Sequence, residues 1–166
     1  NGLVAKARGA KKVVVFDVAQ DRLNLLESLG LPFDGFVNSC QNDPVEWIKT
    51  FTGGRGADAV VVAASVKQLV PVGLKMLARD GHLSIFAGMP KSDPVEPLDL
   101  NLIHYPEVHI HGANSSVQRD YIEACELIAG GKVEAEKLVT HTFSLDDFNA
   151  AVATQGNPAS GALKVI

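Results

Sequence analysis

The chain alternates short runs of β-branched residues with longer segments of helical periodicity, and this alternation restricts the folds open to it. Runs typical of buried strands occupy residues 12–17, 57–63, 82–86 and 108–112, with shorter candidates at 36–38 and 162–166. Apolar residues recur at helical spacing in residues 20–29, 44–51, 66–77 and 119–128. Strands that alternate with helices predict a doubly wound α/β fold, in which helices cover both faces of a parallel sheet.

Capping residues and chain breakers set the expected boundaries of several segments. Asp43-Pro44 is typical of a helix start, with a cap followed by proline at the first helical position. Ser144 and Asp147 have the spacing of a capping box and predict a last helix over residues 144–154. Residues 88–97 are too rich in glycine and proline for regular structure, so we expect a loop there.

The composition is that of a soluble globular protein with one sizeable core, since 46% of the 166 residues are hydrophobic and 20% are charged. The net charge of -4 disfavours a nucleic-acid or anionic-membrane partner, and no apolar run has the length of a membrane span. Cys40 and Cys125 are too few and too far apart for a disulfide framework or a metal knuckle. We expect reduced thiols in a cytoplasmic protein, although a single bridge between the two stays open.

The residue that closes the first strand is the first candidate for a ligand site, because ligands of a doubly wound sheet bind at the carboxyl ends of its strands. This residue is Asp17. A carboxylate there can accept hydrogen bonds from both hydroxyls of an adenosine ribose, and it repels a 2′-phosphate. Arg22, slightly further along, could lay its guanidinium over the adenine. The alternative for Asp17 is a cap of the following helix or turn.

Small residues close the other strands. They are Ala63 and Ala64, Ala87 and Gly88, and Ala113 and Asn114. Small side chains let a flat ring or a ribose approach the backbone, and amides at such strand ends can hold the carboxamide of a nicotinamide. Tight packing of helix on sheet is the alternative reading of each pair. Their recurrence at successive strand ends favours a cofactor site.

The histidines form no recognisable metal or catalytic set. His109 and His111 share one face of their strand and His104 lies nearby, but no cysteine or carboxylate has the spacing of a further ligand. We expect these three, as well as His82 and His141, to be structural or surface residues. The sequence contains no recognisable Ser-His-Asp or Cys-His arrangement either. The sequence therefore predicts no catalytic residue and no metal ligand in this chain.

Several segments taken together resemble the cofactor domain of medium-chain, zinc-type alcohol and polyol dehydrogenases. The similarity covers nearly the whole chain and rests on residues 5–10 (AKARGA), 14–17 (VVFD), 22–23 (RL), 29–30 (LG) and 52–58 (TGGRGAD). Residues 98–105 (LDLNLIHY) are similar to the sorbitol-dehydrogenase-like branch in particular. The resemblance implies a Rossmann-type dinucleotide-binding domain, present in part, across residues 1–166. It also implies hydride transfer between NAD and a secondary alcohol or polyol, with zinc polarising the alcohol oxygen.

The resemblance carries roles to individual positions. Asp17 and Arg22 match the adenosine contacts of the family, and Ala63 and Ala64 match positions beside the adenosine. Four further residues match positions near the nicotinamide end: Ala87, Gly88, Ala113 and Asn114. The zinc ligands and proton relay of the family lie on another domain, so we expect this chain alone to be inactive.

The chain departs from the family pattern at its start, where the G-x-G-x-x-G loop and the strand before it are missing. Gly2 lies too close to Gly9 to be the last glycine of that loop, because the family's helix needs about three turns of 3.6 residues between them. We therefore expect the chain to begin part-way along the first helix.

The nearest alternative in function is a zinc-free quinone or enoyl reductase of the same superfamily, which Asp17 disfavours because those enzymes usually take NADPH. A non-catalytic nucleotide-binding module is the alternative from another class.

Two strand positions carry further expectations. The missing strand would lie between the strand ending at Asp17 and the one ending near Ala63, and a vacancy there would expose two rows of unpaired backbone groups. We expect one of three outcomes: a strand from another chain fills the position, the sheet closes in a different strand order or, as the favoured outcome, the protein has residues beyond this sequence.

Residues 108–111 are expected to form an edge strand that pairs with its own copy in a homo-oligomer. The alternative is that the histidines keep that strand solvated and the protein monomeric.

Overall fold

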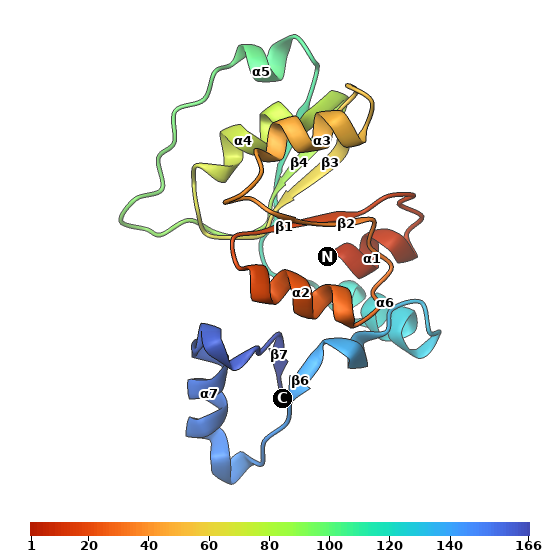
Figure 1. Ribbon diagram of the computed structural model, residues 1–166, viewed down its shortest axis with the longest axis vertical. Coiled ribbons are helices and arrows are strands. Elements are labelled where there is room, and N and C mark those ends of the chain that lie inside the picture. The colour runs from red at the N-terminus through yellow and green to blue at the C-terminus, as the bar shows by residue number, and fades with distance from the viewer. The chain divides into compact units, whose positions relative to one another are not determined.

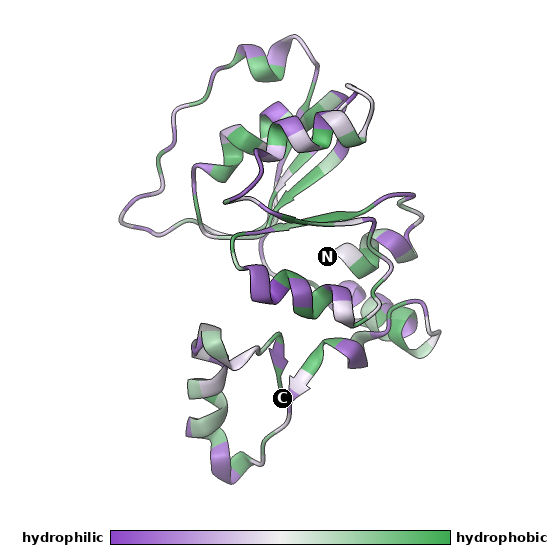
Figure 2. Ribbon diagram, in the orientation of Figure 1, coloured by the Kyte–Doolittle hydropathy of each residue, from purple (hydrophilic) through white to green (hydrophobic). Residues whose placement is uncertain are grey.

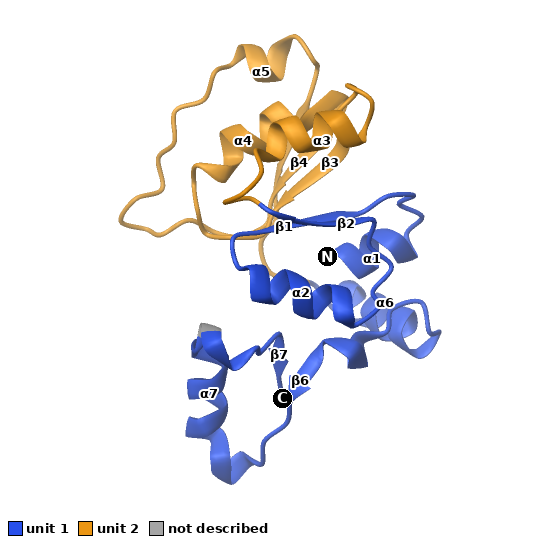
Figure 3. Ribbon diagram, viewed as in Figure 1, with its two compact units in different colours: residues 1–38, 117–166 blue, residues 39–116 orange. Residues whose placement is uncertain are grey.

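The computed structural model describes residues 1–166 with the exception of the side chain of Pro158. The chain forms two compact units, one of residues 1–38 with 117–166 and the other of residues 39–116 (Figure 3). Every strand pair in the described chain is parallel, and helices pack on the strands in both units. The predicted α/β class is therefore confirmed.

The first unit opens with two strands and two helices: α1 (Gly2–Ala7), β1 (Val14–Asp17), α2 (Gln20–Ser28) and β2 (Gly35–Asn38) (Figure 1). β1 pairs with β2 in parallel, from Val14 opposite Gly35 to Asp17 opposite Asn38. α2 packs on both strands and buries Leu23, which is 1% exposed. The helix predicted over residues 20–29 and the strand predicted over residues 36–38 are both confirmed.

The rest of this unit follows the second one in sequence. It contains α6 (Gln118–Ala129), η1 (Ala135–Leu138), β6 (Val139–His141), η2 (Leu145–Asp147), α7 (Phe148–Gly156), η3 (Pro158–Ser160) and β7 (Lys164–Val165). β6 and β7 form a two-stranded parallel sheet. Leu3, Leu31 and Val133 form the centre of an apolar cluster that draws on distant parts of the sequence.

The second unit contains α3 (Pro44–Phe51), β3 (Ala57–Val62), α4 (Leu69–Met76), β4 (Leu77–Ile85), α5 (Asn101–His104) and β5 (His109–Gly112). Its sheet has the order β3-β4-β5, α4 packs on β3 and β4, and α3 packs on α4. Residues 88–97 form a loop that extends away from the sheet in Figure 1, as their glycine and proline content predicts.

Leu83 of β4 is the centre of the second unit's core, with 0% of its surface exposed. It is surrounded by five other buried apolar residues: Val62, Val70, Leu74, Leu77 and Val108. α4 approaches the sheet closely because it carries Gly73 where a Cβ would come within 2.7 Å of Leu83 Cδ1. In Figure 2 hydrophobic colour covers most of β3, whereas α3 carries both hydrophobic and hydrophilic colour.

Two of the predicted boundaries are wrong, for identifiable reasons. The helix expected over residues 66–77 spans Leu69–Met76. Its C-terminal end is set by Leu77, which already pairs with Ala57 as the first residue of β4, five residues before the expected start of that strand. The helix expected from Ser144 starts at Phe148, after a short 3-10 turn. Ser144 makes no capping box, since its Oγ donates to Asp147 Oδ2 at 2.7 Å instead of accepting from the Asp147 N–H.

β1 and β3 lie in separate sheets, and each has a single hydrogen-bonded neighbour in the described chain. The three outcomes expected for the missing strand stay predictions. None of the helices described is long and apolar enough to cross a bilayer.

Candidate cofactor-binding site

Asp17 is the last residue of β1 and stands in register with Asn38 at the end of β2. Its Oδ1 accepts a hydrogen bond from the Ala19 N–H at 2.9 Å, so the carboxylate closes the turn that leads into α2. The capping role considered for Asp17 is thus present. This bond occupies one of the about four acceptor positions that a carboxylate offers. Arg22 is exposed on the first turn of α2.

A chain of side-chain amides lies beside this turn, and the sequence did not reveal it. Asn38 Nδ2 donates to Gln20 Oε1 at 3.1 Å, and Gln20 Nε2 donates to Asn24 Oδ1 at 2.9 Å. The one available signal was a polar residue at the end of a buried strand, which Asn38 shares with Asp17. Because the bonded residues are 18 apart in sequence, no local pattern could have paired Asn38 with Gln20.

In the second unit the three strand ends are level with one another. Val62 pairs with Ile85, and Ile85 with Gly112, so the residues that follow these strands share one edge of the sheet. The Ala87 N–H donates to Val62 O at 3.0 Å and the Ala113 N–H to Ile85 O at 3.1 Å. Both of these backbone N–H groups extend the sheet. A nicotinamide carboxamide would therefore have to meet other atoms of Ala87 and Ala113.

The remaining predicted residues of this edge are accessible. Ala63, Ala64, Gly88 and Asn114 are all exposed. A Cβ at Gly88 would meet no atom within 4 Å, so packing within the chain does not require glycine at this position. The alternative reading of tight helix–sheet packing therefore does not apply to Gly88. The predicted site residues divide between the units, with Asp17 and Arg22 in the first and the other six in the second.

Three histidines line one face of β4 and β5. The rings of His82 and His109 stack with centroids 4.6 Å apart, and His82 Nδ1 lies 2.9 Å from His111 Nε2. His109 Nε2 is 3.0 Å from Asp80 Oδ1. All three rings are exposed, as expected for surface residues. No group of three or more potential ligands in the described part of the chain could hold a metal ion.

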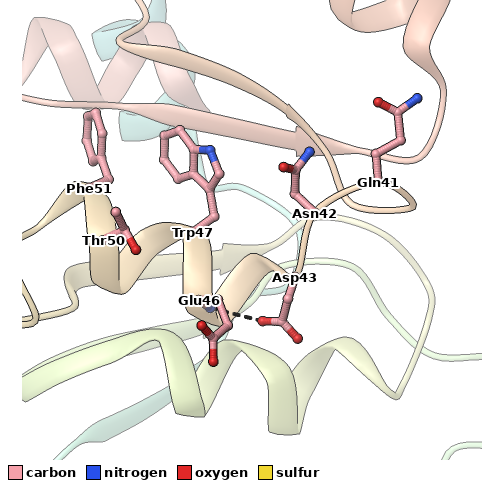
Figure 4. A pocket seen from close by; sticks show the side chains of 7 residues that line it. All are labelled: Gln41, Asn42, Asp43, Glu46, Trp47, Thr50 and Phe51. Carbon is pink, nitrogen blue, oxygen red and sulfur yellow. Dashed lines mark hydrogen bonds between the residues drawn. The ribbon is translucent and has the colours of Figure 1, made fainter.

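A surface hollow lies beside the first turns of α3 (Figure 4). Asp43 caps this helix, since its Oδ1 accepts from the N–H groups of Val45 and Glu46 at 2.8 and 2.9 Å. Trp47 and Phe51 stack with ring centroids 4.8 Å apart. None of the predicted cofactor residues lines this hollow, which is formed by Gln41, Asn42, Asp43, Glu46, Trp47, Thr50 and Phe51.

Comparison with known proteins places these features in a family. Mannitol-1-phosphate 5-dehydrogenase of Aliivibrio fischeri is 31% identical over 145 residues, which cover 81% of this chain and 34% of that protein. Sorbitol dehydrogenase of Bacillus subtilis is 30% identical over 148 residues, or 89% of this chain and 40% of that enzyme. The crystal structure of benzyl alcohol dehydrogenase from Acinetobacter calcoaceticus superposes with a TM-score of 0.84 at 25% identity, covering 99% of this chain and 44% of that one.

The chain therefore spans less than half the length of the relatives it matches. The sequence model of the zinc-binding dehydrogenases matches residues 2–130, from α1 through α6. The resemblance to medium-chain, zinc-type dehydrogenases and the Rossmann-type fold that it implied are confirmed by these matches. The segment that carries Asp17 and the strand ends of the second unit is thus the part that the family shares, and the chain belongs to the zinc-binding dehydrogenase family.

Proposed function

We propose that this chain is the cofactor-binding portion of a zinc- and NAD-dependent alcohol or polyol dehydrogenase. The observation that carries the proposal is Asp17 at the carboxyl end of β1, held by the Ala19 N–H. Its charge favours a ribose with free hydroxyls and repels a 2′-phosphate, and none of residues 18–20 is basic. This disfavours an NADPH-dependent reductase of the same superfamily.

The residues that would hold NAD fit its parts by their chemistry. Asp17 and Arg22 would contact the adenosine, with Ala63 and Ala64 beside it, while the nicotinamide end would meet Ala87, Gly88, Ala113 and Asn114. The exposed small residues at the edge of the second unit suit a flat ring, because no long side chain stands in its way. When bound, NAD accepts the hydride of a secondary alcohol.

In this proposal zinc is bound by residues outside this chain. The described residues contain no set of three or more potential ligands, so the metal would need donors from outside this chain. The relatives are at least twice as long as the matched region, which leaves room for a second domain in the whole protein. The substrate is a small alcohol or polyol in this proposal, and the enzyme works in the cytoplasm.

β5 is the proposed site of self-association. It pairs only with β4 in the described chain, and all four of its residues are exposed. The free edge of such a strand can take up a second strand, and an antiparallel copy related by a two-fold axis satisfies the exposed backbone groups of both.

The test of the function uses the full-length protein that contains this chain. We expect kcat/KM for a polyol to be at least tenfold higher with NAD than with NADP, since a carboxylate–phosphate repulsion of about 1.4 kcal/mol has that effect. Asp17→Ala should raise KM for NAD and lower the ratio of kcat/KM with NAD to kcat/KM with NADP. A preference for NADP in the unaltered protein, or unchanged NAD kinetics in the variant, would contradict the proposal.

A further inference from the structure

Asn38 is the one buried polar side chain among the residues that the structure describes, with 7% of its surface exposed. It ends β2 directly after Val37, which is 3% exposed. Burial of an amide costs free energy unless it is hydrogen-bonded, so an apolar residue would fill this place at lower cost. We therefore look for the role of the Asn38 amide in its hydrogen bond to Gln20.

Asn38 holds the first residue of α2. Its Nδ2 donates to Gln20 Oε1, and Gln20 Nε2 donates in turn to Asn24 Oδ1 one turn further along the helix. The N-cap of α2 is Ala19, which has no side chain able to cap. The amide chain therefore fixes the start of the helix in a place where a capping side chain is lacking.

The start of α2 in turn fixes Asp17. Ala19, whose N–H holds Asp17 Oδ1 at 2.9 Å, directly precedes Gln20. Asp17 and Asn38 are register partners at the ends of the neighbouring strands β1 and β2. The turn is thus held at the sheet by backbone pairing and at the helix by the side chain of Asn38.

We propose that Asn38 is a positioning residue for the nucleotide: through Gln20 and the Ala19 N–H it orients the carboxylate of Asp17. This inference rests on the proposed role of Asp17 in binding the ribose of NAD. Without the Asn38 amide, Gln20 Oε1 loses its link to the sheet, the first turn of α2 loosens and Asp17 is less firmly held in one orientation. The hydride-transfer step itself does not involve these residues, so binding should suffer while turnover does not.

The experiment measures KM for NAD and kcat separately in the full-length protein. Asn38→Leu removes the amide and keeps a side chain of similar size, and it is made in the unaltered protein and in an Asp17→Ala background. Gln20→Leu breaks the same chain from an exposed position and serves if Asn38→Leu does not fold. Asn149→Leu, an exposed site on α7, is the matched control.

We expect Asn38→Leu and Gln20→Leu each to raise KM for NAD about threefold to tenfold, the effect of weakening one hydrogen bond to a charged group, with kcat within about twofold. In the Asp17→Ala background the same changes should alter KM less than about twofold, and the control should alter neither constant. A merely structural role would lower kcat as well, or would raise KM equally in both backgrounds, and either result overturns the inference while the role of Asp17 stands. If Asp17→Ala leaves KM for NAD unchanged, the proposed function fails and the inference fails with it.

Discussion

Gly73 allows a sharp test of the packing between α4 and the sheet. A Cβ at this position would lie 2.7 Å from Leu83 Cδ1 and 3.2 Å from Val60 Cγ1. Leu83 is fully buried, so its methyl group has no solvent-filled space into which it could move. Inserting a methyl group into such a core costs about 1–3 kcal/mol. The better helix propensity of alanine returns about 1 kcal/mol. We therefore expect Gly73→Ala to lower the free energy of unfolding by about 1 kcal/mol.

Leu83→Val separates the steric cause from other effects because it removes the clashing Cδ1 atom. Alone it should cost about 1 kcal/mol through lost burial, within the range for removing one methylene. In the double variant the methyl group added by Gly73→Ala has room, so the two changes should couple favourably by at least about 1 kcal/mol.

Urea unfolding of the 166-residue chain measures these differences, with fluorescence of Trp47 as the probe. Trp47 is the chain's single tryptophan and lies in the same unit as Gly73, so it reports on the unfolding of that unit. Gly156→Ala is the matched control, since it lies in α7 and its Cβ would meet no atom within 4 Å; it should be neutral or slightly stabilising. Additivity of Gly73→Ala and Leu83→Val within about 0.5 kcal/mol would refute the steric argument.

Two further expectations concern a carboxylate and a strand edge. The hydrogen bond from Lys6, aided by one from the Val13 N–H, holds the pKa of Asp34 below its usual value of 3.8. This stabilising contribution is complete above that usual value and is lost as the pH falls through the lower folded-state pKa, so Asp34→Asn should lower Tm at neutral pH and by progressively less in acid. In light scattering the full-length protein should be at least a dimer, and Ile110→Glu on β5 should weaken association by placing like charges of two copies close together; a monomer at high concentration before any substitution would count against the β5 interface.

Elements whose boundaries depend on neighbouring residues followed from the sequence. α3 begins after Asp43 because the carboxylate of that residue accepts from two backbone N–H groups two and three positions later. β1 could be predicted because a run of β-branched residues suits a strand whatever its partner is. Asp17 ends its strand, and the small residues of the second unit follow the carboxyl ends of theirs, as the strand pattern predicts.

Features that depend on distant partners did not follow from the sequence. β4 starts at Leu77 because that residue pairs with Ala57, which lies twenty positions earlier, and helical periodicity alone extends across this boundary. β6 was not predicted because its three residues have no strand pattern apart from their pairing with β7. The hydrogen bond from Asn38 to Gln20 could not be predicted because the two residues are 18 apart in the sequence. Gln20 looked like an ordinary polar residue at a helix start.

The two readings of Asp17 that the sequence left open, a turn cap and a proposed ribose ligand, are compatible with one arrangement. As a cap, Asp17 accepts the Ala19 N–H and loses much of its side-chain rotation before any ligand arrives. A carboxylate that is already oriented loses less conformational entropy on binding, so the geometry that stabilises the turn would also strengthen the proposed binding of two ribose hydroxyls. The capping bond therefore supports the proposed role in nucleotide binding. The Asn38 amide adds to this restraint by binding Gln20, because the N-cap residue Ala19 makes no side-chain capping bond to α2.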